Sequence, residues 1–209
     1  MFANQIIAFI GSGIMGEAMI QGLLKNKTVA PEQIIAADAR PERLEELAAK
    51  YGVHTTLNNL DAATQANILV LSIKPQVMDQ VLPEVRAGAK TCSFVLSIVA
   101  GVPIRRISDG LANPCVVRVM PNTPARIGQG ISVWTATAET PEPQHEQARL
   151  LLHAFGEEIY VKDEDYLDMA TALSGTGPAY VFMFMEAMID AGVHMGFSRH
   201  MAEKLVIQT

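Results

Sequence analysis

Residues 9–20 read FIGSGIMGEAMI, an apolar strand that enters a glycine turn and leaves it as an apolar helix. In the pattern Gly11-x-Gly13-x-x-Gly16 the first glycine allows a tight turn and the second lets a pyrophosphate approach the backbone. The third allows the helix to pack closely on the strand, with the diphosphate at the helix N-terminus. An acidic residue, Asp38, follows the next expected strand. The stretch therefore predicts a dinucleotide site, and the alternative is a tight strand-to-helix turn without a ligand.

The fold predicted around this turn is a doubly wound α/β domain of Rossmann type with a parallel sheet covered on both faces, because apolar runs without in/out alternation are separated by helical patterns. The expected strands are residues 6–10, 34–37, 68–73, 93–98, 116–120, 131–136 and 158–161. The expected helices are residues 14–25, 41–51, 61–65, 76–85 and 143–155, followed by 164–173, 178–191 and one that starts near Ser198. Strand patterns stop near residue 163. We therefore expect a nucleotide-binding domain over residues 1–162 and a helical domain over residues 163–209.

The composition is that of a globular protein, with 49% hydrophobic and 18% charged residues. A formal net charge of -6 and the lack of a basic run argue against a nucleic-acid partner. Cys92 and Cys115 have no metal-ligand spacing, and we expect reduced thiols in a cytoplasmic protein. Residues 179–185, AYVFMFM, are far shorter than the roughly 20 residues of a membrane span. No metal site is expected, because Glu186 and Asp190 have no histidine at ligand spacing.

The choice between NAD and NADP depends on residues 36–44, AADARPERL. Asp38 is placed to hold the ribose hydroxyls and to repel a 2′-phosphate, whereas Arg40 and Arg43 could clamp that phosphate. Asp38 could also cap the following helix, and Arg43 could lie on a solvated helix face. These residues alone leave both cofactors open.

Two further strand ends are expected beside the cofactor. Ser72, Ile73, Lys74 and Pro75 follow the strand at 68–73, at the carboxyl edge where ligands of such folds bind. A residue before proline is held extended, although Lys74 could equally be an ordinary exposed lysine. Small residues close the next strand at 97–101, SIVAG, which lets a nicotinamide riboside approach the backbone.

Five motifs in succession, FIGSGIMGEAM, LSIKPQ, SIVAGV, RVMPNTPA and ALSGTGPAYVF, resemble those of pyrroline-5-carboxylate reductase over all 209 residues. The resemblance implies NAD(P)H-dependent reduction of the cyclic imine 1-pyrroline-5-carboxylate to L-proline, the last step of proline biosynthesis, with NADP(H) preferred and NAD(H) possible. It implies a diphosphate loop of Gly11, Ser12, Gly13, Ile14, Met15 and Gly16, with Arg40 as phosphate partner and Asn59 on the adenosine side. It also implies a nicotinamide half flanked by Ser72, Ile73, Lys74 and Pro75 with Val99 and Ala100 nearby, and a reaction chamber bordered by Pro121, Asn122, Thr123 and Pro124.

The same resemblance implies a further serine-proline-glycine-glycine-threonine-threonine motif that receives the substrate carboxylate. This sequence stops before such a motif. We therefore expect the helical domain to be incomplete as given.

The chemistry expected from residues 163–209 needs few catalytic side chains, because a protonated C=N bond is already electrophilic and orientation supplies most of the acceleration. Residues 174–177, SGTG, form a loop before a helix with Pro178 in its first turn, and the N–H groups of Gly175 and Thr176 there can bind an anion. Thr171 is the first candidate for the hydrogen-bond partner of the imine nitrogen, and Ser174 is the second. Each could instead be a hydroxyl satisfied within the helix.

Two other functions stay open. A β-hydroxyacid dehydrogenase has a similar opening motif, but it uses a lysine in an asparagine-containing motif, and the only lysine after residue 162 is Lys204, with no asparagine beside it. A nucleotide-binding module without chemistry is the third possibility. The helix at 178–191 is apolar almost all round, and we expect it to be buried in a homodimer or larger homo-oligomer.

Overall fold

A computed structural model describes residues 2–209 and places eight strands in one sheet. The strands are β1 (Ile7–Ile10), β2 (Ile34–Ala37), β3 (His54–Thr56), β4 (Ile68–Leu71), β5 (Phe94–Ser97), β6 (Val116–Met120), β7 (Gly130–Ala136) and β8 (Gly156–Tyr160). Their order is β3-β2-β1-β4-β5-β6-β7-β8, and every neighbouring pair is parallel except β6 and β7. The strands are added outward from β1 to β3 on one side of the sheet and from β4 to β8 on the other. The strand order therefore reverses between β1 and β4, which is the switch point where ligands of such folds bind.

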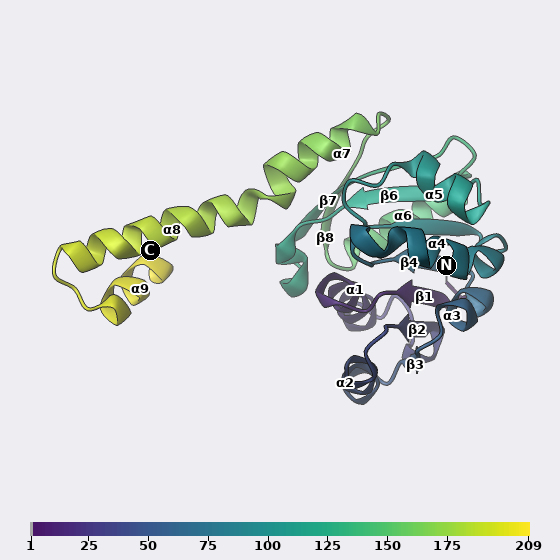
Figure 1. Cartoon of the computed structure of the whole chain (residues 1–209), viewed down its shortest axis with the longest axis horizontal. Coiled ribbons are helices and arrows are strands. Elements are labelled where there is room, and N and C mark those ends of the chain that lie inside the picture. The colour runs from purple at the N-terminus through teal and green to yellow at the C-terminus, as the bar shows by residue number, and fades with distance from the viewer. Residues whose placement is uncertain (1) are drawn as a thin grey trace.

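Helices cover both faces of the sheet (Figure 1). One face packs on α1 (Ile14–Lys25), α2 (Pro41–Tyr51) and α6 (Glu142–His153), and the other on α3 (Asn59–Gln65), α4 (Met78–Ala89) and α5 (Ile104–Leu111). Alternate residues of β1 point to opposite cores, Ile7 and Phe9 to the first and Ala8 and Ile10 to the second, and all four are fully buried. Burial on both faces explains why the strands read as unbroken apolar runs.

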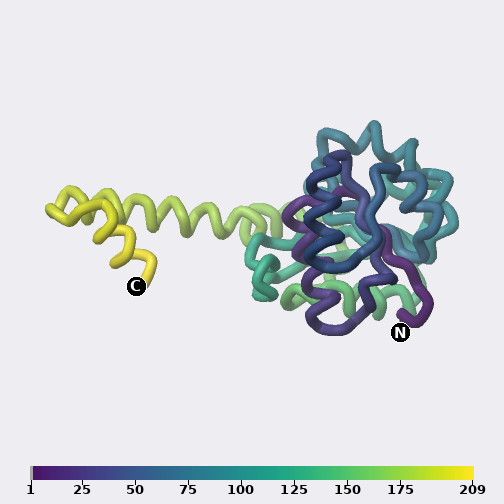
Figure 2. The backbone as a smooth tube through the Cα atoms, turned by 90° about the horizontal axis from the view of Figure 1, so that it is seen from below, coloured from purple at the N-terminus to yellow at the C-terminus, as the bar shows by residue number. Residues whose placement is uncertain are grey.

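A helical arm follows the sheet and projects away from it (Figures 1 and 2). It consists of α7 (Asp165–Ala170), the π-helical turn η4 (Thr171–Gly175), α8 (Gly177–His194) and α9 (Arg199–Gln208). The Ser198 hydroxyl accepts a hydrogen bond from the Met201 N–H at 3.3 Å, as a helix N-cap does. Helix α9 folds back on α8, where the Cβ of Ala202 lies 3.0 Å from the position that a Cβ on Gly192 would take.

The predicted fold class is confirmed, and the individual elements differ from prediction in five main respects. Strand β3, which has three residues, and helix α5, which has eight, were not predicted. The sheet was expected to be parallel, whereas β6 and β7 are antiparallel. Helix α4 runs through Pro83 to Ala89 instead of ending at Val85, because both Val85 and Ala89 are fully buried and their packing offsets the proline. The helix expected over 164–173 is interrupted by η4.

Three short 3-10 turns complete the chain, namely η1 (Pro31–Gln33), η2 (Pro75–Val77) and η3 (Thr123–Ile127). Among residues 2–209, none of the helices has the length and apolar character to cross a membrane.

Candidate active site

The glycine turn joins β1 to α1 and is tightly packed on its inner side. Gly11 has a φ of +84°, and a Cβ there would lie 2.6 Å from the Cγ2 atom of Ile73. A Cβ on Gly16 would lie 2.8 Å from the Gly11 carbonyl oxygen. Gly13, by contrast, faces open space, with no atom within 4 Å of its Cβ position, and it begins α1 without a side-chain cap. The head of α1 is therefore open to an anionic group, and the turn fits a dinucleotide diphosphate.

Asp38 lies at the carboxyl end of β2 and is held by the glycine turn. Its Oδ2 atom accepts a hydrogen bond from the Ser12 N–H at 3.1 Å, and its Oδ1 atom accepts one from the Arg40 Nε at 3.0 Å. Partial burial opposes ionisation, but these hydrogen bonds outweigh it and lower the pKa of Asp38 below its usual value. Asp38 and Arg40 thus form an ion pair whose opposite charges cancel, and the Arg40 side chain is 62% exposed.

The Arg43 side chain is held by Ser12 of the glycine turn and by Glu17 of α1. Its Nε atom donates to the Ser12 carbonyl oxygen at 2.9 Å, and its guanidinium pairs with Glu17 of α1. Burial raises the pKa of Glu17, but hydrogen bonds from Arg43, Lys50 and Tyr51 outweigh it and hold the pKa at about 2. Of the two arginines that the sequence offered to a phosphate, the structure leaves only Arg40 at the surface.

The strands after β1 bring their carboxyl ends to the same edge. The Ser72 hydroxyl donates to the Gly11 carbonyl oxygen at 2.5 Å, so the end of β4 is tied directly to the glycine turn. Lys74 is exposed and extended, with φ -74° and ψ 146°, as expected for a residue before proline. After β5, the Val99 N–H donates to the Ser97 hydroxyl at 3.3 Å, and Ala100 is half-buried. Asn59 begins α3 beyond β3, and its side-chain amide donates to Glu84 at 2.9 Å.

The end of β6 contacts η4 of the helical arm. The Asn122 side chain donates to the Ser174 hydroxyl at 3.1 Å and accepts from the Ile131 N–H at 3.0 Å. A Cβ on Gly175 would lie 2.4 Å from the Met120 methyl carbon, so the π-helical turn packs closely on this strand end. π-Helical turns are rare and frequently occur at functional sites.

The three hydroxyl groups in and beside η4 differ in whether they donate a hydrogen bond within the chain. Thr171 donates to the Leu167 carbonyl oxygen at 2.8 Å, one helical turn back. Both the N–H and the hydroxyl of Thr176 donate to the Thr171 carbonyl oxygen, at 2.9 Å each. The hydroxyl protons of Thr171 and Thr176 are therefore used in hydrogen bonds to nearby carbonyl oxygens, whereas the Ser174 hydroxyl accepts its hydrogen bond from Asn122 and does not donate within residues 2–209. Thr123 lies exposed at the start of η3.

Comparison with known proteins agrees with this geometry. Residues 6–101 match the family model described as NADP oxidoreductase coenzyme F420-dependent, and residues 164–209 match pyrroline-5-carboxylate reductase dimerisation. The pyrroline-5-carboxylate reductase of Pseudomonas aeruginosa is 41% identical over 204 residues, which are 97% of this chain and 74% of the relative. The chain belongs to the pyrroline-5-carboxylate reductase family.

Solved structures of the pyrroline-5-carboxylate reductase family have the same fold. The enzyme from Coxiella burnetii superposes with a TM-score of 0.87 at 33% identity, covering 98% of this chain and 76% of that one. The Plasmodium falciparum pyrroline carboxylate reductase with NADP bound superposes with a TM-score of 0.85 at 28% identity, covering 98% of this chain and 75% of that one. The chain thus spans about three quarters of the length of these reductases.

One ion-pair cluster around a buried arginine was not predicted from the sequence. The Arg118 side chain, 6% exposed on β6, donates to Glu164 at 2.6 Å and to Asp168 at 3.1 Å. Glu164 also accepts from the N–H of Ile104, the first residue of α5, at 2.7 Å. The signal in the sequence was an arginine within the apolar strand VVRVM, but its partners lie 46 and 50 residues away. The cluster fixes the start of the helical arm to β6 and α5.

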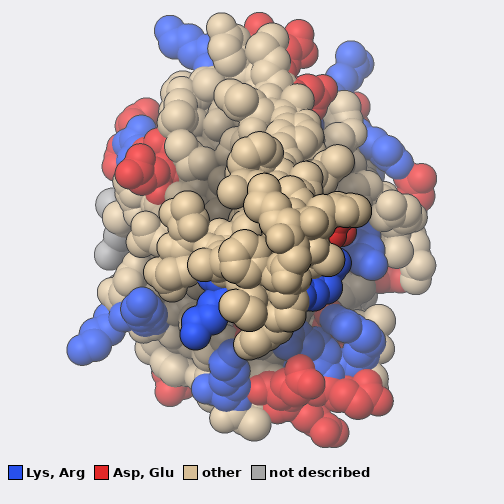
Figure 3. Space-filling model, turned by 90° about the vertical axis from the view of Figure 1, so that its left-hand side faces the viewer, with Lys and Arg blue, Asp and Glu red and all other residues tan. Residues whose placement is uncertain are grey.

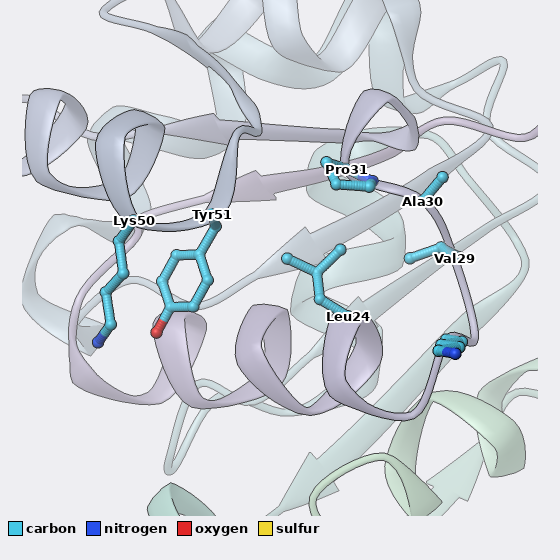
Figure 4. A pocket seen from close by; sticks show the side chains of 7 residues that line it. Leu24, Val29, Ala30, Pro31, Lys50 and Tyr51 are labelled. Carbon is cyan, nitrogen blue, oxygen red and sulfur yellow. The ribbon is translucent and has the colours of Figure 1, made fainter.

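A hollow on the surface of the reductase lies elsewhere (Figure 4). It is lined by Leu24, Lys27, Val29, Ala30, Pro31, Lys50 and Tyr51. Leu24 lies near the C-terminal end of α1, about 15 Å along the helix from its glycine-rich start. This hollow is therefore separate from the strand ends that the family resemblance assigns to the cofactor.

Proposed function

We propose that this chain reduces the C=N bond of 1-pyrroline-5-carboxylate to give L-proline, with NAD(P)H as the reductant. The observation that carries the proposal is the meeting of the glycine turn, the ends of β4 and β5, and η4 at one edge of the sheet. The names of the related enzymes support the same reaction.

The residues that would hold the cofactor follow from the strand ends. The open space at Gly13 suits the diphosphate, and Ser72–Pro75 with Val99 and Ala100 would flank the nicotinamide, which supplies a hydride when bound. We propose NADP(H) as the preferred cofactor, because Arg40 neutralises Asp38 and thereby reduces its repulsion of a 2′-phosphate. Two nitrogens of the guanidinium donate to Asp38, and the third, Nη1, is on an exposed side chain and can reach that phosphate. NAD(H) remains acceptable, since the Asp38 carboxylate is in place at the end of β2.

Ser174 is the better placed of the two hydroxyl candidates for the imine nitrogen. Its proton is not engaged in the helix, whereas the Thr171 hydroxyl donates to Leu167. We therefore assign Ser174 as the hydrogen-bond donor and Thr171 as a secondary contact. Reduction of an imine needs no side chain to remove a proton from the substrate, so a positioned hydrogen-bond donor is the side-chain contribution that we propose.

We assign residues 163–209 to a domain that joins two copies of the chain. Helix α8 has no buried residue, and large apolar side chains along the arm are exposed. They include Tyr180, Val181, Phe182, Met183, Phe184, Met188, Met201 and Leu205. Figure 3, which looks at the molecule from the side of the arm, shows uncharged side chains over the centre of this face. A patch of this kind is typical of a protein–protein interface, and a homodimer is the expected assembly.

The test is oxidation of NADPH in the presence of 1-pyrroline-5-carboxylate, by this chain and by a version extended to the full length of its relatives. We expect turnover in the extended protein at least, and a lower KM for NADPH than for NADH. An Arg40→Ala variant should raise the KM for NADPH more than the KM for NADH. Oxidation of a 3-hydroxyacid with no activity on the imine would identify a β-hydroxyacid dehydrogenase instead. Cofactor binding without turnover in either version would leave a nucleotide-binding module.

A further inference from the structure

Asn122 joins three segments of the chain, of which η4 in the helical arm is distant in the sequence. It follows β6 and precedes η3, its Oδ1 atom accepts from the Ile131 N–H of β7 at 3.0 Å, and its Nδ2 atom donates to the Ser174 Oγ of η4 at 3.1 Å. The two sides of one amide thus connect the end of β6 to the next strand and to the helical arm.

The direction of the Asn122–Ser174 hydrogen bond is fixed by chemistry. A backbone N–H can only donate, so the amide oxygen of Asn122 must face Ile131. The amide NH₂ then faces Ser174, and because an NH₂ group can only donate, the Ser174 oxygen must accept. The hydroxyl proton of Ser174 is therefore directed away from Asn122. Within residues 2–209 that hydroxyl makes no second hydrogen bond.

The position of Ser174 is held as well as its orientation. Gly175, the next residue, packs against the Met120 methyl group so closely that a Cβ would lie 2.4 Å from it. Ser174 lies within the π-helical turn and is half-buried. Packing through Gly175 and the hydrogen bond from Asn122 therefore hold the hydroxyl against the end of β6.

We propose that Asn122 is a positioning residue that turns the Ser174 O–H toward the imine nitrogen of the substrate. This inference rests on the proposed reductase function and assigns Asn122 to Ser174, not to the substrate as the family resemblance implies. This role requires the unprotonated imine and not the protonated form expected from the sequence, because a protonated nitrogen has no lone pair to accept an O–H. When hydride adds to the carbon, the π electron pair of the C=N bond moves to the nitrogen, and a fixed O–H donor stabilises the negative charge that develops there. The nitrogen takes its proton from water, and Ser174 keeps its own.

The test is a variant, Asn122→Asp, that reverses the direction of the Asn122–Ser174 hydrogen bond with almost no change in the shape of the side chain. In Asn122→Asp one carboxylate oxygen still accepts from Ile131, but the other now accepts the Ser174 proton and so removes the donor from the substrate. We expect kcat to fall by about 100- to 1,000-fold, as for loss of a donor to a developing anion. The dissociation constant for NADPH should stay within about twofold, because the two hydrogen-bond partners of the Asn122 side chain, Ile131 and Ser174, lie outside the glycine turn.

A double-mutant cycle separates positioning from a structural role. Ser174→Ala should lower kcat by a similar factor, and Asn122→Asp added to Ser174→Ala should have no further effect on kcat. Asn113→Asp is a matched control. Its amide is buried, donates to the carbonyl oxygens of Ala89 and Cys92 at 2.7 and 3.0 Å, and accepts from the Cys115 N–H at 2.9 Å. It lies before β6, at the opposite end of that strand, so this variant should lower the melting temperature without a comparable loss of kcat.

Three outcomes would overturn the inference. They are an unchanged kcat in Asn122→Asp, an unchanged kcat in Ser174→Ala, or independent and multiplicative losses in the double variant. Each is measured in a protein whose unaltered form turns over, so it leaves the reductase function standing. Failure of the unaltered protein to reduce the imine would instead contradict the proposed function itself.

Discussion

Gly11→Ala should destabilise the fold, whereas Gly13→Ala should weaken cofactor binding. At Gly11 the φ of +84° costs an alanine about 1–2 kcal/mol. The Cβ would also lie 2.6 Å from Ile73 Cγ2 and 2.9 Å from the Ser72 carbonyl oxygen, and overpacking of this kind adds about 1–3 kcal/mol. The sum is about 2–5 kcal/mol. At about 2–4 °C per kcal/mol for a chain of this size, the melting temperature should fall by about 4–20 °C.

Gly13→Ala is the matched control, because it introduces the same methyl group two residues away. Its φ is -69° and no atom lies within 4 Å of the new Cβ, so the cost should stay within about 1 kcal/mol, from the poorer N-cap. The methyl group would stand where the diphosphate approaches the backbone, and we expect the dissociation constant for NADPH to rise at least about tenfold.

The assays are urea unfolding without cofactor and fluorescence titration with NADPH. Equal destabilisation by the two variants would refute the reasoning from backbone geometry. Unaltered NADPH binding by Gly13→Ala would refute the placement of the diphosphate.

Three further predictions concern the rest of the chain. Glu164→Ala should lower the free energy of unfolding in urea by about 2–4 kcal/mol, because it leaves the buried Arg118 with only one carboxylate partner. Asp168→Ala should lower it by less than about 1 kcal/mol, because the Asp168 side chain is 72% exposed. Equal losses in the two variants would contradict the cluster as described. The folded pKa of Glu17, about 2, lies below its ordinary 4.5, so the ionised carboxylate stabilises the fold above about pH 4.5 and that contribution is lost as the pH falls toward 2. Glu17→Gln should therefore be less stable than the unaltered protein at pH 7, and the difference should vanish between pH 4.5 and 2; a difference that is constant with pH would argue against the ion pairs. Burial raises the pKa of the Cys92 thiol to about 11, so iodoacetamide at pH 8 should modify it only after unfolding, as peptide mass mapping with and without urea can check.

Much of the nucleotide-binding half could be predicted from local sequence. The boundaries of α1, α2 and β2 were correct because glycine, proline and apolar periodicity act within a few residues of one another. The strand ends carrying Asp38 and Ser72 could be placed because parallel strands present their carboxyl ends at one edge. Short elements were harder to predict from the sequence. Strand β3 exists because β2 pairs with it, and its own three residues carry little signal.

The sequence by itself determined the dinucleotide turn, the Rossmann-type fold and the family, since these depend on short motifs and on runs of apolar residues. The tertiary structure decided which polar groups remain free to act. It engaged Arg43 with Ser12 and Glu17 and left Arg40 exposed, and it engaged the Thr171 hydroxyl while leaving the Ser174 proton free. Asn122 and Ser174 are 52 residues apart, and only the packing of η4 on the end of β6 brings them within a hydrogen bond. A side-chain hydrogen bond over that separation depends on the whole path of the chain, and no local pattern in the sequence encodes it.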